Sequence, residues 1–166
     1  MTHYGQIYID GAWVDPSTDA TRAVIDPTTE AAFASVGQAG VADVDRAVAA
    51  ARRAFVGFSQ TSVADRAALI DSIIAAYKAR APEFADVIAR EVGVPVSFAA
   101  QVNGPVGHME VARDLLKTYA FESRIGDTII RREPIGVCAL ISPWNWPIQT
   151  SVIKLIYAIA AGCTSI

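Results

Sequence analysis

The sequence of residues 137–166, VCALISPWNWPIQTSVIKLIYAIAAGCTSI, decides the fold class. Residues 137–142 are mostly apolar, which suits a buried parallel strand. A loop bracketed by two prolines follows, and residues 148–161 predict a helix whose buried stripe consists of Val152, Leu155, Ile156 and Ile159. Gly162 ends this helix, and residues 163–166 begin a second strand. The succession of strand, helix and strand is typical of a βαβ unit and predicts an α/β protein.

The loop inside this unit is the expected ligand-binding edge. In open α/β sheets, ligands bind at the carboxyl ends of the strands, which points to residues 141–147. The chain contains no Gly-x-Gly-x-x-Gly motif, so the usual dinucleotide fingerprint gives no support here. The position of the loop after a strand, rather than a glycine motif, marks the candidate site.

The first forty residues predict a small β-rich layer. Asp10-Gly11 separates two short β-prone runs at residues 7–9 and 12–14, which is a strong signal for a hairpin. Residues 23–25 and 33–36 predict two further strands, and the sequence that begins Asp26-Pro27 predicts a turn between them.

Hydrophobic periodicity predicts four helices in the middle of the chain. The first begins at Gly40 and ends at Gly57, and the second opens at a capping box of Ser-x-x-Asp type at residues 62–65. A third helix is expected to begin at Pro82, and a fourth to follow a break at Gly104-Pro105. Beyond the last helix, residues 125–133 predict strands joined by a turn at Gly126-Asp127.

Composition excludes several classes of partner. The 166 residues are 52% hydrophobic and 19% charged, which is ample for a packed core. The net charge of −3 gives no electrostatic reason to expect nucleic acid or an anionic membrane. No signal peptide or membrane span is predicted, and no metal site. Cys138 and Cys163 are too few for a disulfide framework, so we expect buried, reduced thiols in a cytoplasmic protein.

The chain resembles the NAD(P)-dependent aldehyde dehydrogenase superfamily. The resemblance rests on Glu-Pro-x-Gly-Val from Glu133, on Pro-Trp-Asn-Trp-Pro from Pro143, and on a helix that contains Lys154 and ends Ala-Ala-Gly-Cys-Thr. Earlier motifs occur in the same order: Ile-Asp-Gly-x-Trp, then Ala-Asp-Val-Asp-x-Ala-Val-x-x-Ala-Arg-x-Ala-Phe, then Glu-x-Gly-x-Pro from Glu91. The likeness covers essentially the whole chain.

This resemblance implies an incomplete N-terminal part of the aldehyde dehydrogenase fold, with a Rossmann-like cofactor domain. Residues 1–120 would form the first part of that domain, residues 121–134 a β-strand oligomerisation element, and residues 135–166 the first βαβ unit of the cofactor domain. It further implies a homo-oligomeric oxidoreductase that takes a small-molecule aldehyde and does not bind nucleic acid or membrane.

The reaction implied by the resemblance is oxidation of an aldehyde to a carboxylic acid, with NAD or NADP as cofactor. In the family a cysteine thiolate attacks the carbonyl carbon. Asn145 matches the asparagine whose amide donates a hydrogen bond to the developing oxyanion, although an asparagine can also merely satisfy a tight turn. The positions that line the dinucleotide site are matched by Ile141, Ser142, Pro143 and Trp144. Packing in the core is the alternative for Trp144, and the expected role of Trp146.

The chain stops before the family's nucleophilic cysteine and glutamate base, and neither Cys138 nor Cys163 lies in the nucleophile's sequence context. We therefore expect these 166 residues alone to be inactive. Two alternatives stay open: a non-catalytic interaction protein that pairs with full-length subunits through residues 125–133, and a cofactor-binding module that acts alone. The identity of the aldehyde and the choice between NAD and NADP are open as well.

Overall fold

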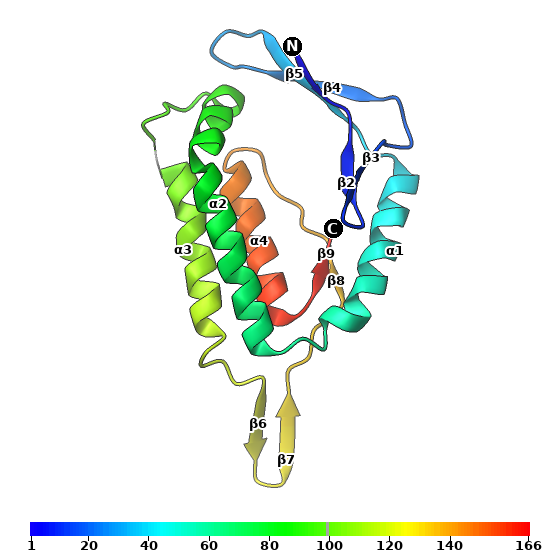
Figure 1. Ribbon diagram of the computed structural model, residues 1–166, viewed down its shortest axis with the longest axis vertical. Helices are drawn as coiled ribbons and strands as arrows, with labels where there is room; N and C mark the ends of the chain where they lie inside the picture. The colour runs from blue at the N-terminus through cyan, green and yellow to red at the C-terminus, as the bar shows by residue number, and fades with distance from the viewer. Residues whose placement is uncertain (99) are drawn as a thin grey trace.

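A computed structural model describes residues 1–98 and 100–166, which form four helices and nine short strands. Three helices lie side by side as a bundle, a β-rich layer covers one end, and a hairpin projects from the other (Figure 1). Helix α1 (Val41–Phe58) lies apart from this bundle, across the short strands near the C-terminus (Figure 1). The mixed architecture confirms the predicted α/β class.

The N-terminal layer contains the predicted hairpin and a three-stranded sheet that includes both of the other predicted strands. Strands β2 (Ile7–Ile9) and β3 (Ala12–Val14) pair antiparallel. The turn residues Asp10 and Gly11 have φ angles of 55° and 79°, the left-handed conformations that a two-residue hairpin turn requires. The sheet has the order β1-β5-β4, built from β1 (Thr2–Tyr4), β4 (Thr21–Ile25) and β5 (Ala32–Gly37). The sequence analysis did not predict β1, which pairs parallel with β5.

Two of the predicted breaks between helices are absent. Helix α2 (Val63–Val92) runs through Pro82, where a new helix was predicted to begin. A proline inside a helix removes one hydrogen bond, but Tyr77 and Phe84 stack across it with ring centroids 4.9 Å apart. Helix α3 (Ala100–Leu115) likewise runs through Gly104-Pro105, and Pro105 is fully buried. Packing between helices therefore outweighs the local cost of each proline.

The ends of helices follow local signals more closely. Ser62 caps α2 as predicted, since its hydroxyl accepts a 3.1 Å hydrogen bond from the Asp65 backbone N–H. Gly93 ends α2 in the left-handed conformation, with a φ of 76°. The end of α1 was wrongly predicted at Gly57, because the helix continues to Phe58. A glycine costs only about 1 kcal/mol inside a helix, and the Ser59 N–H still bonds the Phe55 carbonyl at 2.9 Å.

The predicted βαβ unit is confirmed at the C-terminal end. Strand β8 (Val137–Cys138) leads through a loop to α4 (Pro147–Ala161), and β9 (Thr164–Ser165) returns parallel to β8. The regular strand is shorter than the predicted 137–142. Hydrogen bonds of 2.9 Å from the Leu140 N–H to the Ile166 carbonyl and 3.0 Å from the Ile166 N–H to the Cys138 carbonyl continue the ladder.

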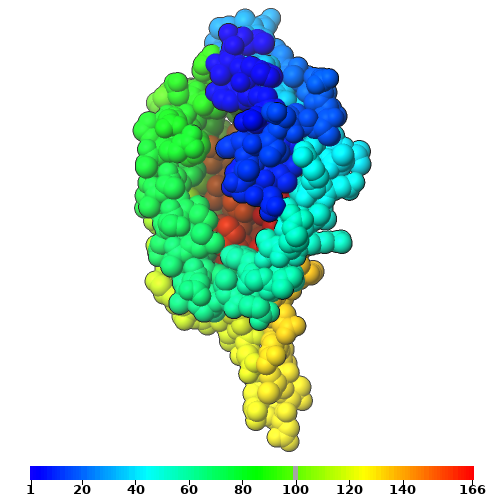
Figure 2. Space-filling view, turned by 45° about the vertical axis from the view of Figure 1, so that its right-hand side comes forward, coloured from blue at the N-terminus to red at the C-terminus, as the bar shows by residue number. Residues whose placement is uncertain are grey.

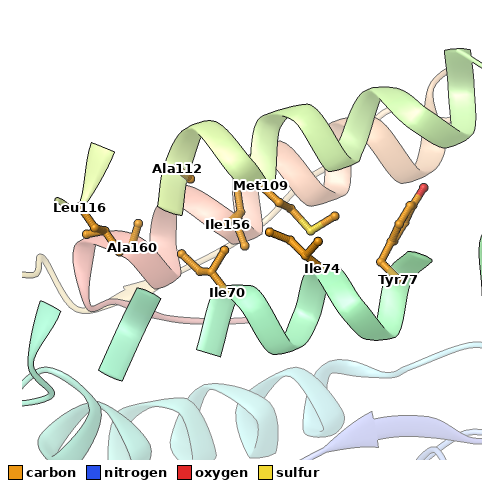
Figure 3. Close-up of a cluster of buried hydrophobic side chains, with 8 residues drawn as sticks. All are labelled: Ile70, Ile74, Tyr77, Met109, Ala112, Leu116, Ile156 and Ala160. Carbon is orange, nitrogen blue, oxygen red and sulfur yellow. The ribbon is translucent and has the colours of Figure 1, made fainter. Parts of the chain in front are cut away.

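The main apolar core lies between α2, α3 and α4 (Figure 3). Its eight buried members are Ile70, Ile74, Tyr77, Met109, Ala112, Leu116, Ile156 and Ala160. The Tyr77 hydroxyl satisfies its polar end by donating a 2.8 Å hydrogen bond to the Val102 carbonyl. Because α4 belongs to the βαβ unit, this core fixes the unit against the preceding helices.

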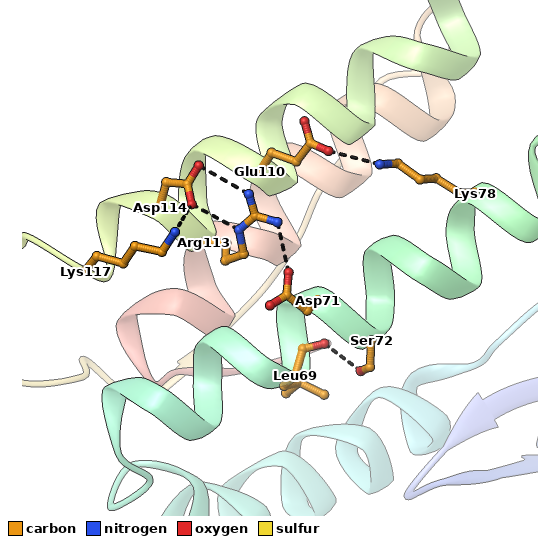
Figure 4. A network of polar contacts seen from close by, with 8 residues as sticks. All are labelled: Leu69, Asp71, Ser72, Lys78, Glu110, Arg113, Asp114 and Lys117. Atoms are coloured by element: carbon orange, nitrogen blue, oxygen red, sulfur yellow. Dashed lines mark hydrogen bonds and ion pairs between the residues drawn. The ribbon is translucent and has the colours of Figure 1, made fainter.

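Salt bridges cover the solvent side of the contact between α2 and α3 (Figure 4). Arg113 pairs with Asp71 at 2.9 Å and with Asp114 at 3.1 Å, and Lys78 pairs with Glu110 at 3.0 Å. Hydrogen bonds from Arg113 and then Lys117 lower the pKa of Asp114 to about 2. These ion pairs are largely exposed, so we assign them little stability.

Asp43 is the buried carboxylate that anchors α1 to the N-terminal layer. It is 1% exposed and accepts hydrogen bonds from the backbone N–H groups of Ser17 (2.9 Å) and Gly40 (2.8 Å). The Ser17 hydroxyl and the Arg46 guanidinium also donate to it. These donors, the two backbone N–H groups first, hold the pKa of Asp43 well below its usual range.

The low pKa of Asp43 predicts a loss of stability in acid. A carboxyl whose folded pKa lies below its unfolded value stabilises the fold fully above that unfolded value, and the contribution disappears as pH falls through the folded pKa. We expect Asp43→Asn to be destabilised at neutral pH and to lose less further stability than the wild type between roughly pH 5 and pH 2. Thermal unfolding monitored by circular dichroism measures this. The exposed Asp45→Asn is the matched control, and a wild-type acid profile in Asp43→Asn would contradict the prediction.

Candidate functional site

The candidate site is the loop that joins β8 to α4. It leaves the carboxyl end of a parallel strand and ends at the first turn of a helix, the position expected for a ligand in an α/β sheet. Pro147 occupies the first helical position, where its missing N–H costs nothing. The Trp146 carbonyl accepts hydrogen bonds from the Thr150 hydroxyl at 2.7 Å and the Thr150 N–H at 3.0 Å. These contacts fix the C-terminal end of the loop.

All five predicted site residues lie on this loop, and most of their side chains face solvent. Ile141 and Trp144 are 83% and 84% exposed, so the loop presents two large apolar side chains to solvent. Pro143 and Asn145 are exposed as well. Ser142 differs, because its hydroxyl oxygen is buried and has no hydrogen-bond partner among the described residues. The loop therefore presents apolar surface, one free amide and one unsatisfied hydroxyl.

Trp146 holds the loop against the rest of the molecule. It is half-buried, and its ring lies 6.1 Å, centroid to centroid, from that of Phe98. A packing role agrees with the expectation for Trp146. The alternative of core packing is wrong for Trp144, whose side chain is exposed.

A groove adjoins the start of the loop, and the sequence analysis did not predict it. Ile141 lines a cavity of about 300 Å³ together with residues of the β2–β3 hairpin and α1. A neighbouring cavity of about 420 Å³ lies between that hairpin, α1, α2 and α4. Figure 2 shows the hollow bordered by the hairpin, α1 and α2, with C-terminal residues at its floor. The N-terminal hairpin and the loop near residue 141 are far apart along the chain, so no local sequence pattern predicts that they border the same groove.

The two thiols are not placed as activated nucleophiles. Cys163 is 4% exposed and Cys138 is half-buried. Burial first, and then the neighbouring Cys163, raise the pKa of the Cys138 thiol. A raised pKa reduces the thiolate fraction that reacts with carbonyl groups. The expected structural role is thus supported most clearly for Cys163.

Metal-ligating clusters and membrane-spanning helices are both absent from the described part of the chain. Residues 1–98 and 100–166 contain no group of three or more histidine, cysteine, aspartate or glutamate side chains suited to a metal ion. None of the helices that they form combines the length and the apolar character needed to cross a bilayer.

Comparisons with known proteins identify the family of this chain. Residues 13–166 match the model of the aldehyde dehydrogenase family. A curated relative, the 3-succinoylsemialdehyde-pyridine dehydrogenase of a Pseudomonas species, is 41% identical over 100% of this chain and 35% of its own length. The chain therefore spans about a third of that relative.

Solved structures show the same fold. A mutant of aldehyde dehydrogenase C from Pseudomonas syringae, crystallised with NAD+ and octanal, is 49% identical with a TM-score of 0.94, over 96% of this chain and 33% of that one. An aldehyde dehydrogenase from Bartonella henselae is 35% identical with a TM-score of 0.96, over 99% of this chain and 36% of that one. Matched from residue 13 to residue 166, the chain belongs to the aldehyde dehydrogenase family.

Proposed function

We propose that this chain supplies the oxyanion donor and part of the cofactor site of an NAD(P)+-dependent enzyme that oxidises an aldehyde to a carboxylic acid. The observation that carries the proposal is the loop after β8, which presents Asn145 and Trp144 to solvent at the carboxyl end of a parallel strand. A related structure was crystallised with NAD+ and octanal, which supports both ligand classes.

The residues of the loop fit a dinucleotide. The buried Ser142 hydroxyl has no partner in the described part of the chain, and an unsatisfied buried hydroxyl is costly unless a ligand completes it. Ile141 and Trp144 offer exposed apolar surface on which planar rings can pack. When bound, NAD(P)+ would accept the hydride. The part played by this chain is to hold the cofactor through Ile141, Ser142, Pro143 and Trp144.

Asn145 acts on the substrate oxygen in this proposal. Its side-chain amide is a neutral donor that keeps its protons at any physiological pH. The side chain is exposed, so its N–H groups are accessible. A fixed donor aimed at a developing negative charge stabilises the transition state more than the ground state. Asn145 would thus lower the barrier to carbonyl attack while the nucleophile comes from outside these residues.

We also propose that the chain consists of part of a cofactor domain and a projecting oligomerisation element. Residues 1–120 and 135–166 share one apolar core through α2, α3 and α4, which supports their assignment to one cofactor domain. Strands β6 (Glu122–Ile125) and β7 (Thr128–Arg131) form the projecting hairpin (Figure 1). Ile125 and Ile129 on it are 68% and 49% exposed, which favours residues 121–134 as a homo-oligomer contact. Free thiols suit the reducing cytoplasm.

Tryptophan fluorescence tests the proposed cofactor contact. In a complete enzyme that carries these residues, NAD+ should quench the intrinsic fluorescence, and Trp144→Phe should remove most of that change. Trp13→Phe is the matched control, since Trp13 is also exposed but lies on β3. If Trp144→Phe keeps the full NAD+-dependent change, the loop does not contact the cofactor.

A further inference from the structure

Arg66, in the first turn of α2, is a buried cation without a carboxylate partner. The residue is 6% exposed, and no described carboxylate forms an ion pair with it. The Nη1 atom donates a 2.7 Å hydrogen bond to the Thr61 carbonyl, and the guanidinium lies 5.3 Å from the centroid of the Phe121 ring. The Nε atom is buried and has no acceptor among the described residues. A buried charge of this kind is costly unless something compensates it.

The neighbouring groups compensate only part of the buried Arg66 charge. The Nη1 atom lies near the C-terminal end of α4, because a Cβ atom on Gly162 would be 3.4 Å from it. The negative end of the helix dipole therefore offsets some of the charge. The ring face of Phe121 offsets some more. Neither provides an acceptor for Nε, and burial still lowers the pKa of Arg66.

Arg66 lines a cavity of about 590 Å³ that also contains a second arginine without an ion pair. This second residue, Arg132, donates a 3.2 Å hydrogen bond to the Ala120 carbonyl and forms no salt bridge within the described chain. The two glutamates at the same cavity, Glu122 and Glu133, both lie within 3.9 Å of Arg131. Three arginines (Arg66, Arg131 and Arg132) and two glutamates line the cavity, which leaves it a net charge of +1.

The N-terminus of α2 faces the same cavity. Ser62, the N-cap, and Val63, the first helical residue, are both among its lining residues. A helix of 30 residues carries a partial positive charge at this end, and of its first N–H groups that of Asp65 is already bonded to the Ser62 hydroxyl. Arg66, Arg132 and the N-terminus of α2 therefore border one space, and the two arginines supply the positive charge there, because the Asp65 carboxylate already complements the helix N-terminus.

We infer that the Arg66–Arg132 cavity is a binding site for a small oxyanion of the phosphate type. Guanidinium forks match the oxygen atoms of phosphate and donate charge-assisted hydrogen bonds to them. A tetrahedral anion reaches more than one donor at once, whereas chloride offers a single centre. The site lies at the opposite end of the βαβ unit from the candidate active-site loop, since it adjoins Ala161 after α4 rather than Trp146 before it. It is therefore separate from the proposed cofactor site.

Isothermal titration of the purified chain with potassium phosphate, at an ionic strength kept constant with potassium chloride, tests this site. We expect saturable binding by the wild type and a loss of roughly tenfold or more in affinity in Arg132→Gln. Arg124→Gln, an exposed change of equal charge on β6, is the control and should bind like the wild type. Arg66→Lys, which keeps the charge but not the fork, should also weaken binding.

Sodium acetate in a parallel titration separates a tetrahedral anion from a carboxylate. A site of the phosphate type should bind acetate more weakly than phosphate. Arg132→Gln should then lose this acetate binding. If Arg66→Lys does not fold, Arg132→Gln still decides the question because Arg132 is exposed. No phosphate binding by the folded wild type, acetate binding tighter than phosphate, or equal phosphate affinity in Arg132→Gln and Arg124→Gln would overturn the inference.

Discussion

Replacing Asn145 by Ala in a complete aldehyde dehydrogenase that carries these residues should lower kcat by roughly 10²–10³-fold and change KM little. The oxyanion develops only along the reaction path, so a donor directed at it contributes to the transition state rather than to substrate binding. The exposure of Asn145 and its lack of a partner among the described residues agree with a side chain that is reserved for substrate.

Steady-state NADH formation, combined with single-turnover measurements, is the appropriate experiment because it separates chemistry from product release. Asn103→Ala is the control, since Asn103 is an exposed asparagine on α3. It should leave kcat unchanged. A normal kcat in Asn145→Ala, with the chemical step shown to limit turnover, would leave Asn145 with only a role in the turn.

The second large effect is expected in the core. Ile70 is 0% exposed and packs between α2, α3 and α4 (Figure 3). Ile70→Ala should reduce the free energy of unfolding by about 2–5 kcal/mol, because the lost methylene groups leave a cavity that rigid helices fill only partly. Urea denaturation of the purified protein measures the change. Val56→Ala, at a position of α1 that is 73% exposed, should stay within about 0.5 kcal/mol of the wild type.

Equal unfolding midpoints for Ile70→Ala and the wild type would mean that the three helices do not share a cooperative core. In that case the βαβ unit would not depend on α2 for its position. A loss of the same size in Val56→Ala would show that the effect is not specific to this core.

Turns and helix caps could be predicted from sequence because their chemistry is local. The Asp10-Gly11 turn needs two residues that tolerate positive φ, and the chain supplies them at adjacent positions. The Ser62 cap and the Gly162 stop depend on atoms within four or five residues. The site loop was found in the same way, because strand, loop and helix follow one another directly.

Prolines misled the prediction where distant contacts decided the outcome. Pro82 and Pro105 each carry the local signal of a helix boundary, yet both lie inside helices. The stacking of Tyr77 on Phe84 and the burial of Pro105 stabilise these helices and offset the backbone hydrogen bonds that the prolines remove. The parallel pairing of β1 with β5 joins residues more than thirty positions apart, and three residues give no usable periodicity.

The sequence by itself determined the βαβ unit, the loop that carries Asn145, and the family resemblance that assigns that loop a chemistry. Only the tertiary structure decided that Ser142 buries an unsatisfied hydroxyl and that Arg66 and Arg132 share one cavity. The physical reason is the distance along the chain over which each interaction acts. Backbone preferences and capping act over a few residues, whereas burial and the compensation of charge depend on which distant segments the packed core brings together.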